Sequence, residues 1–209
     1  MSKRRGPRSV HSDGSGDAGR VPSAAAMRLL EAAFDLFEKK GFDNTTVDEI
    51  AHRCGMSKST IYLHFRGKED ILVTGIQPLI DLLAGVLDAP EAGRGNYASR
   101  LEFVMRSYVH LGLSNRKEAS VLALLGPETP VGILTRRRRS EIERSVADLI
   151  LGGIEVGEFR GDLDPLLTAR LLLSLSNWVT VWYQRNGVLA PEAIAQAVAS
   201  LGLDGLTRS

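Results

Sequence analysis

A short stretch early in the chain combines cationic, hydroxyl and aromatic side chains without any acid. Between Ile50 and Lys68 there are four Lys or Arg residues and two His but neither Asp nor Glu, in a 209-residue chain of formal net charge +1. Lys and His can pair with phosphate oxygens, which would repel a carboxylate. Small hydroxyl side chains approach base edges closely, and a tyrosine adds an apolar ring. The chemistry indicated by these residue types is the binding of double-stranded DNA.

Helical spacing divides the second half of this stretch into an inner and an outer face. Ile61 and Phe65 are four residues apart and are expected to face the core together. The residues left outside are polar, cationic or aromatic: Lys58, Ser59, Tyr62 and part of Thr60. Two plainer interpretations stay open, since the tyrosine could pack beneath the helix beside Ile61 and the lysine could be an ordinary solvated charge.

Two short helices joined by a tight turn would position this outer face. Thr46, followed three residues later by Glu49, forms a capping-box pattern that predicts a helix over residues 47–54. Gly55 suits the left-handed position that ends a helix, and Ser57 suits the cap of the next one. The pattern describes a helix-turn-helix, whose second helix enters the major groove and which reads near-palindromic sites as a dimer.

The segment TTVDEIAHRCGMSKSTIYLHFRGKEDIL, preceded by AAFDLFEKKGF, resembles the DNA-binding region of the tetracycline-repressor-like (TetR) family of bacterial regulators. The resemblance covers residues 25–75. It implies an all-α homodimer with three N-terminal helices for DNA and a larger helical domain that binds a small molecule. The DNA-contacting positions that it implies are Thr46, Lys58, Ser59, Thr60, Tyr62, His64 and Lys68. Leu63 departs from the polar or aromatic residue often found at its position and receives no DNA role.

The chain divides into a tail and two helical parts. Residues 1–22 are aperiodic and mildly basic, so we expect a flexible tail in which the GSGDAG match to a dinucleotide-binding pattern is a linker. The tail could instead reach a DNA minor groove. Residues 23–70 form the predicted helix-turn-helix domain and 71–209 the predicted ligand-binding and dimerisation domain. Helices are expected over 96–113, 116–125, 131–156, 164–185 and 191–201, and Pro78 predicts a kink or break in the fourth helix.

The C-terminal part offers weaker signals for a ligand. The segment from EFRGDLDPLLTAR to ASLGLDGL resembles TetR-family regulators that answer to acyl-CoA thioesters in lipid or steroid catabolism, which implies an acyl-CoA effector. The candidate ligand-binding residues are Arg138, Asn177, Trp178 and Trp182. Arg138 belongs to four consecutive arginines, which point in four directions on a helix and are expected to be mostly solvated. The two tryptophans could equally pack in the core or at a subunit interface.

Composition excludes several other functions. The single cysteine, Cys54, excludes an internal disulfide and a zinc site of paired cysteines, and it is expected to be a small buried filler. No secretory signal or membrane span is recognised, so a cytoplasmic location is expected. No catalytic, metal or cofactor motif occurs among the four histidines, so no enzyme, no metal and no cofactor is expected. An architectural, a ligand-independent or an activating DNA-binding protein remains an alternative.

Overall fold

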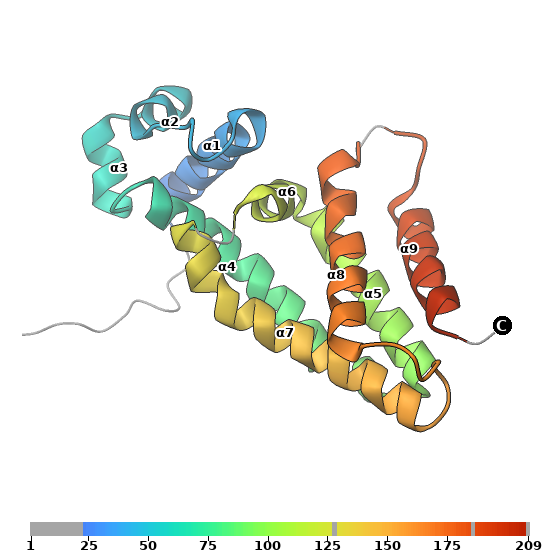
Figure 1. Ribbon diagram of the computed structural model, residues 1–209. Coiled ribbons are helices and arrows are strands. Elements are labelled where there is room, and N and C mark those ends of the chain that lie inside the picture. The colour runs from blue at the N-terminus through green and yellow to red at the C-terminus, as the bar shows by residue number, and fades with distance from the viewer. Residues whose placement is uncertain (1–22, 127–128, 185–186, 208–209) are drawn as a thin grey trace, which may run out of the picture.

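The computed structural model describes residues 23–126, 129–184 and 187–207. Within these ranges the chain is all-helical and has no strand, which confirms the predicted fold class (Figure 1). The elements are α1 (Ala24–Lys40), α2 (Val47–Cys54), α3 (Lys58–His64), α4 (Lys68–Leu87), η1 (Pro90–Gly93), α5 (Tyr97–Ser114), α6 (Arg116–Leu124), α7 (Pro130–Glu155), α8 (Pro165–Trp182) and α9 (Pro191–Leu206). The predicted tail and its GSGDAG motif lie outside the described residues.

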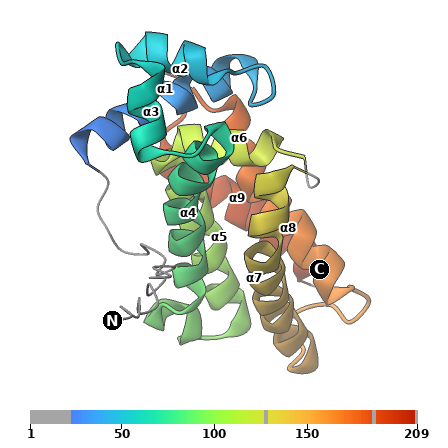
Figure 2. The ribbon, with the colours of Figure 1, turned by 90° about the vertical axis from the view of Figure 1, so that its left-hand side faces the viewer.

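Two apolar cores lie one above the other along α4 (Figure 2). The upper core is built around Phe34 and Phe37 of α1 and includes the helix-turn-helix and the first turns of α4. Gly75 permits the close approach of α1 and α4, because a Cβ at this position would lie 2.2 Å from the Phe34 ring. The lower core joins α4, α5 and the three helices that follow α6.

The upper core is not confined to the first four helices. Val121 of α6 and Val131 of α7 are buried in it, and Leu122 packs against it. Two segments that sequence analysis assigned to the ligand-binding part therefore pack against the helix-turn-helix. This packing ties the two parts of the chain together.

Several helix boundaries differ from those expected. Pro78 does not break the fourth helix, because α4 runs without interruption from Lys68 to Leu87. α8 ends at Trp182, earlier than predicted, and α9 continues to Leu206, later than predicted. The last turn of α9 was not predicted, because small residues and two glycines near its end interrupt the helical pattern of apolar residues.

α4 is long and apolar enough to satisfy the length and composition of a membrane span, with a mean hydropathy of 1.6 across the matching segment. Its apolar residues are used inside the protein. Ile71, Leu72 and Ile76 are fully buried in the upper core, and Leu79 and Leu83 are buried in the lower one. α4 is therefore a core helix shared by both parts of the protein.

Candidate DNA-binding surface and effector cavity

The helix-turn-helix forms as its caps predict. Thr46 caps α2 by accepting from the Glu49 amide, while the Glu49 carboxylate accepts from the Thr46 amide at 2.9 Å. Gly55 ends α2 in the left-handed conformation at φ 66°, and the Ser57 hydroxyl accepts from the Thr60 amide at 3.1 Å to start α3. Cys54 is buried, as expected. The turn between α2 and α3 is thus fixed by local chemistry.

The outer face of α3 has the predicted composition and one addition. Ile61 is completely buried and Phe65 is nearly so, while Tyr62 is 52% exposed. Ser59 is exposed, and Thr60 is partly covered, with its hydroxyl paired to that of Ser57. Leu63, to which no DNA role was assigned, is 83% exposed.

The lysine of this face is already paired. Lys58 Nζ lies 2.9 Å from Asp48 Oδ2 of α2, and this hydrogen bond raises the pKa of Lys58. Both side chains are at least half exposed. Asp48 lies two residues before the acid-free stretch, so the charge count over that stretch does not include it. Folding nevertheless brings its carboxylate beside Lys58.

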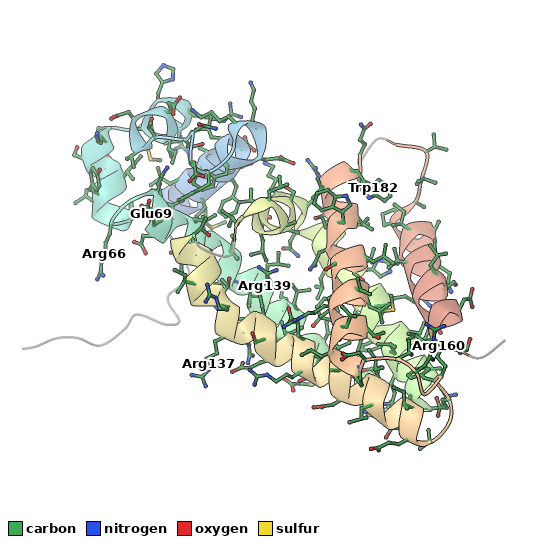
Figure 3. The ribbon with its side chains drawn as sticks, viewed as in Figure 1. Arg66, Glu69, Arg137, Arg139, Arg160 and Trp182 are labelled. Carbon is green, nitrogen blue, oxygen red and sulfur yellow. The ribbon has the colours of Figure 1, made fainter. Side chains whose placement is uncertain are left out.

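The other cations around α3 have different surroundings. Lys68 donates to the carbonyls of Phe42 and Asp43 at 3.1 and 3.2 Å and lies over the Phe42 ring, so it fastens the start of α4 to the loop before α2. His64 is exposed at the end of α3. Arg66 extends outward from the same end (Figure 3) and was not among the predicted contacts, although it belongs to the acid-free stretch. Arg66 is thus an accessible cation of this surface, with the exposed His64 near it.

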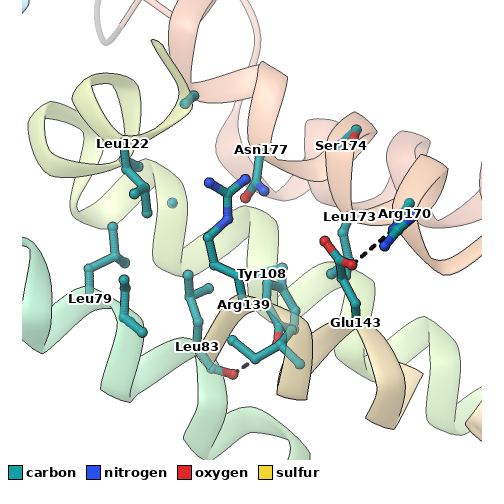
Figure 4. Close-up of a pocket in the computed structure, with 15 residues that line it drawn as sticks. Leu79, Leu83, Tyr108, Leu122, Arg139, Glu143, Arg170, Leu173, Ser174 and Asn177 are labelled. Atoms are coloured by element: carbon teal, nitrogen blue, oxygen red, sulfur yellow. Dashed lines mark hydrogen bonds and ion pairs between the residues drawn. The ribbon is translucent and has the colours of Figure 1, made fainter. Parts of the chain in front are cut away.

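A cavity of about 230 Å³ lies between α4, α5, α6, α7 and α8 (Figure 4). Its apolar wall comes mainly from Leu79 and Leu83 of α4, Leu122 of α6 and Leu173 of α8. Tyr108 lines it as well and donates to the Leu83 carbonyl at 3.0 Å, and burial raises the pKa of this hydroxyl. The cavity is therefore suited to an apolar group.

Polar side chains lie along one side of this cavity. Arg139 projects into it toward Asn177, and it has no ion-pair partner among the described residues (Figure 4). Glu143 forms a 2.9 Å ion pair with Arg170 at the same side, next to Ser174. A mostly apolar pocket with a few convergent polar groups is the usual form of a small-molecule site.

The arginine that lines the cavity is Arg139, whereas sequence analysis predicted Arg138 as the ligand-binding residue. Arg138 does not line the cavity; with Arg137 it pairs with Glu141, and these pairs lower the pKa of that carboxyl. Arg137 points away from the body of the protein (Figure 3). Of the predicted ligand-binding residues, only Asn177 lines the cavity.

Trp178 and Trp182 lie on a different face of α8. They are about half exposed and line an apolar groove between α8 and α9 with Leu175, Ala197 and Leu201. Other residues of these two helices face the chain's own core instead: Ala169, Leu172, Ser176, Ala195 and Ala199 are buried.

Helix α6 connects the cavity to the helix-turn-helix. It lines the cavity through Ala119, Leu122 and Ala123, whereas its first two residues form ion pairs to α1. Arg116 lies 2.5 Å from Glu38, and Lys117 pairs with Asp35.

Asp35 extends this connection to α2. Its carboxylate also accepts from Arg53 of α2 at 2.6 Å. The hydrogen bonds from Arg53 and then Lys117 lower the pKa of Asp35. One carboxylate thus joins three helices, namely α1, α2 and α6.

Comparison with protein families matches both parts of the chain. Residues 29–74 match the family described as bacterial regulatory proteins, tetR family. Residues 94–206 match the tetracyclin repressor-like C-terminal domain. Residues 1–28, 75–93 and 207–209 lie outside the two matches.

Known proteins resemble the chain over most of its length. The HTH-type transcriptional repressor KstR2 of Rhodococcus jostii is 30% identical over 202 residues, which are 93% of this chain and 94% of that protein. The crystal structure of SCO3833, a TetR regulator from Streptomyces coelicolor, shares 30% identity with a TM-score of 0.77 and covers 86% of this chain and 91% of that one. AibR, solved with isovaleryl coenzyme A and operator DNA, is 23% identical, covers 85% and 97% of the two chains, and shares the fold with a TM-score of 0.71.

Proposed function

Because the chain belongs to the TetR family of bacterial regulatory proteins, we propose that it is a transcriptional repressor that a small molecule releases from its operator. The α3 face carrying Lys58, Ser59 and Tyr62 enters the major groove of a near-palindromic site, and His64 contacts a phosphate. Thr46 at the start of α2 and the cations around α3 bind the flanking phosphates. Without effector the protein stays on the operator and blocks transcription.

The observation that carries this proposal is the double role of α6. Three residues of this nine-residue helix line the cavity, and its first two residues are ion-paired to α1, which packs against the helix-turn-helix. We propose that the effector fits the cavity only after α6 has moved. Because α6 is ion-paired to α1, this movement also changes the arrangement of the DNA-binding helices, and effector binding therefore favours the changed arrangement. The difference in effector affinity between the two arrangements sets the size of the response.

The proposed effector is an acyl-CoA thioester. The apolar wall suits an acyl group, and Arg139 with Asn177 suits the polar end that joins it to the rest of the ligand. A cavity of about 230 Å³ is smaller than the roughly 300–1,000 Å³ of pockets that enclose whole drug-sized ligands, so coenzyme A would remain largely outside. The AibR complex supports this class, because a protein of the same fold binds isovaleryl coenzyme A.

The protein works as a homodimer in the cytoplasm and catalyses no reaction. The exposed apolar groove of α8 and α9 is the proposed subunit contact, which sets two recognition helices about one DNA turn apart. Among the described residues that line the cavity, Ser174 lies beside an arginine, a glutamate and an amide but no histidine. This surrounding supports binding rather than nucleophilic catalysis.

A direct test measures binding of the full-length protein to the DNA upstream of its own gene by fluorescence anisotropy. We expect salt-sensitive binding whose dissociation constant rises on addition of one class of acyl-CoA and not of coenzyme A alone. Failure to prefer any duplex over random DNA would remove the repressor proposal. Operator binding that no acyl-CoA changes would remove the effector class and leave DNA binding in place.

A further inference from the structure

Leu63 is the most unusual residue of the recognition helix. It is 83% exposed, whereas the leucines of the two cores are buried. An isolated exposed leucine is ordinary on a protein surface. This one lies on a seven-residue helix whose other outward side chains are all polar or aromatic, on the surface proposed above to bind DNA.

The position of Leu63 on α3 places it among the DNA-facing residues. Ser59, Tyr62 and Leu63 stand at i, i+3 and i+4, so they share one face of the helix. The opposite face carries the buried Ile61. Leu63 comes four residues after Ser59, which is about 6 Å along the helix axis, or roughly two base-pair steps of 3.4 Å.

Neither subunit contact nor the protein core accounts for this leucine. α3 lies at the opposite end of the molecule from α8 and α9, where the apolar groove is found (Figures 1 and 2). The cations around α3 are Lys58, Arg66 and Lys68, and among the described residues the one acid that pairs with them there is Asp48, beside Lys58. This excess of cationic side chains suits an anionic partner. The occupant that fits both the cations and the leucine is a DNA duplex.

We infer that Leu63 reads the 5-methyl group of a thymine in each half of the operator. A leucine side chain neither donates nor accepts a hydrogen bond, so it cannot read the polar edge of a base. The thymine methyl is the apolar group that a base pair presents in the major groove. Leu63 therefore selects for thymine at one base pair in each half-site, near the bases that Ser59 and Tyr62 approach.

The inference rests on the proposed DNA-binding function, and one experiment separates the two. The full-length protein is used to select its preferred site from a random duplex pool. Each thymine of that site is then replaced by deoxyuridine, which removes the methyl group and keeps every hydrogen-bonding group. We expect one symmetric pair of positions at which the dissociation constant rises about fourfold per half-site, the equivalent of one methyl group leaving an apolar contact.

The variant Leu63→Ala assigns this effect to the leucine. It should bind the thymine site more weakly than the wild type and lose the difference between thymine and deoxyuridine at that pair alone. Leu63→Met should keep part of the difference, because it remains apolar. Leu82→Ala, a change at an exposed leucine of α4, should behave as the wild type, and unchanged thermal unfolding of Leu63→Ala would show that its fold is intact.

Three outcomes would overturn the inference. Equal binding of thymine and deoxyuridine duplexes at every position would remove methyl reading and leave the repressor function untouched. A thymine preference that Leu63→Ala retains would assign the reading to another side chain. Selection of no duplex at all would remove the DNA-binding proposal together with this inference.

Discussion

At the scale of single residues, Arg139 and Arg137 form a natural pair for testing the cavity. Arg139 points into it, while Arg137 is 91% exposed at its side chain and points away. We predict that Arg139→Gln weakens binding of the releasing acyl-CoA by about tenfold or more, because a hydrogen bond to a charged group contributes about 1.5–3 kcal/mol. Calorimetric titration measures this. Arg137→Gln should change nothing, and equal losses in both variants would contradict a specific role for Arg139.

Asp48 is predicted to weaken DNA binding in the wild type. It holds Lys58 in an exposed ion pair and places a carboxylate beside the recognition helix. We expect Asp48→Asn to lower the dissociation constant for DNA and to steepen its salt dependence, by a log–log slope of about 0.9 for one added phosphate contact. Anisotropy titrations at several salt concentrations measure both. The exposed Asp162 supplies a control, Asp162→Asn, and weaker DNA binding by Asp48→Asn would contradict the prediction.

The capping box of α2 gives a prediction about stability and pH. Thr46→Ala should lower the free energy of unfolding by about 1 kcal/mol. The hydrogen bond from Lys40, and those from Thr46, lower the pKa of Glu49 from 4.5 to about 2. The stabilisation by this carboxylate is therefore complete above pH 4.5 and disappears as the pH falls toward 2. Urea unfolding of the wild type and Glu49→Gln should differ at pH 7 and converge at the acid end.

Sequence patterns predicted residue positions where local chemistry decides them. The caps Thr46 and Ser57, the turn at Gly55 and the inward pair on α3 follow from spacing alone, and all are observed. The arginine that enters the cavity was assigned one position too early. Successive helical residues differ by about 100° in direction, and only the packing of α7 against its neighbours selects the one that faces inward.

At the scale of elements, α6 is predicted to carry the response from the cavity to the DNA-binding helices. The double variant Arg116→Gln with Lys117→Gln removes both ion pairs to α1. Partly exposed pairs of this kind contribute about 0.2–1 kcal/mol each, whereas coupling between two sites is typically 1–3 kcal/mol. We therefore expect the effector to bind nearly as before but to raise the operator dissociation constant by a factor several times smaller.

The measurement is a thermodynamic cycle of effector and operator binding to the same protein. Coupling is reciprocal, so operator DNA should also weaken effector binding less in the double variant. Arg106→Gln removes an ion pair to Glu192 of α9, away from α6, and should leave the response unchanged. A full response in the Arg116 and Lys117 double variant would show that the coupling uses another path.

Element boundaries were predictable where a cap or a turn residue marks them. α2 and the start of α3 were predicted to the residue from their caps, and Asp164 with Pro165 marked the start of α8. Pro78 does not produce the break that was one of its two predicted effects, because the buried apolar residues on both sides of it keep α4 helical despite the missing amide donor. That α6 packs against α1 could not be predicted, since this contact depends on long-range packing rather than on spacing.

At the scale of the whole molecule, the α8 and α9 face is the proposed subunit contact, on which the reading of a palindrome would depend. Trp178, Trp182 and Leu201 expose large apolar surfaces in one groove, which a second copy of the chain would cover. Pairing about a two-fold axis would then set the recognition helices about 34–36 Å apart, the spacing of successive major grooves. The tryptophans were predicted from sequence as either ligand or interface residues, and their exposure favours the interface.

We predict that Trp178→Glu converts the dimer into a monomer, because each interface would then bury two unpaired carboxylates related by symmetry. Sedimentation measures the mass of the species. Loss of the second half-site contact should weaken operator binding by about 100-fold or more, while affinity for an isolated half-site stays close to that of the wild type. Ile133→Glu places the same charge at an exposed position of α7 and should remain dimeric. A Trp178→Glu protein that stays dimeric and keeps its operator affinity would place the subunit contact elsewhere on the molecule.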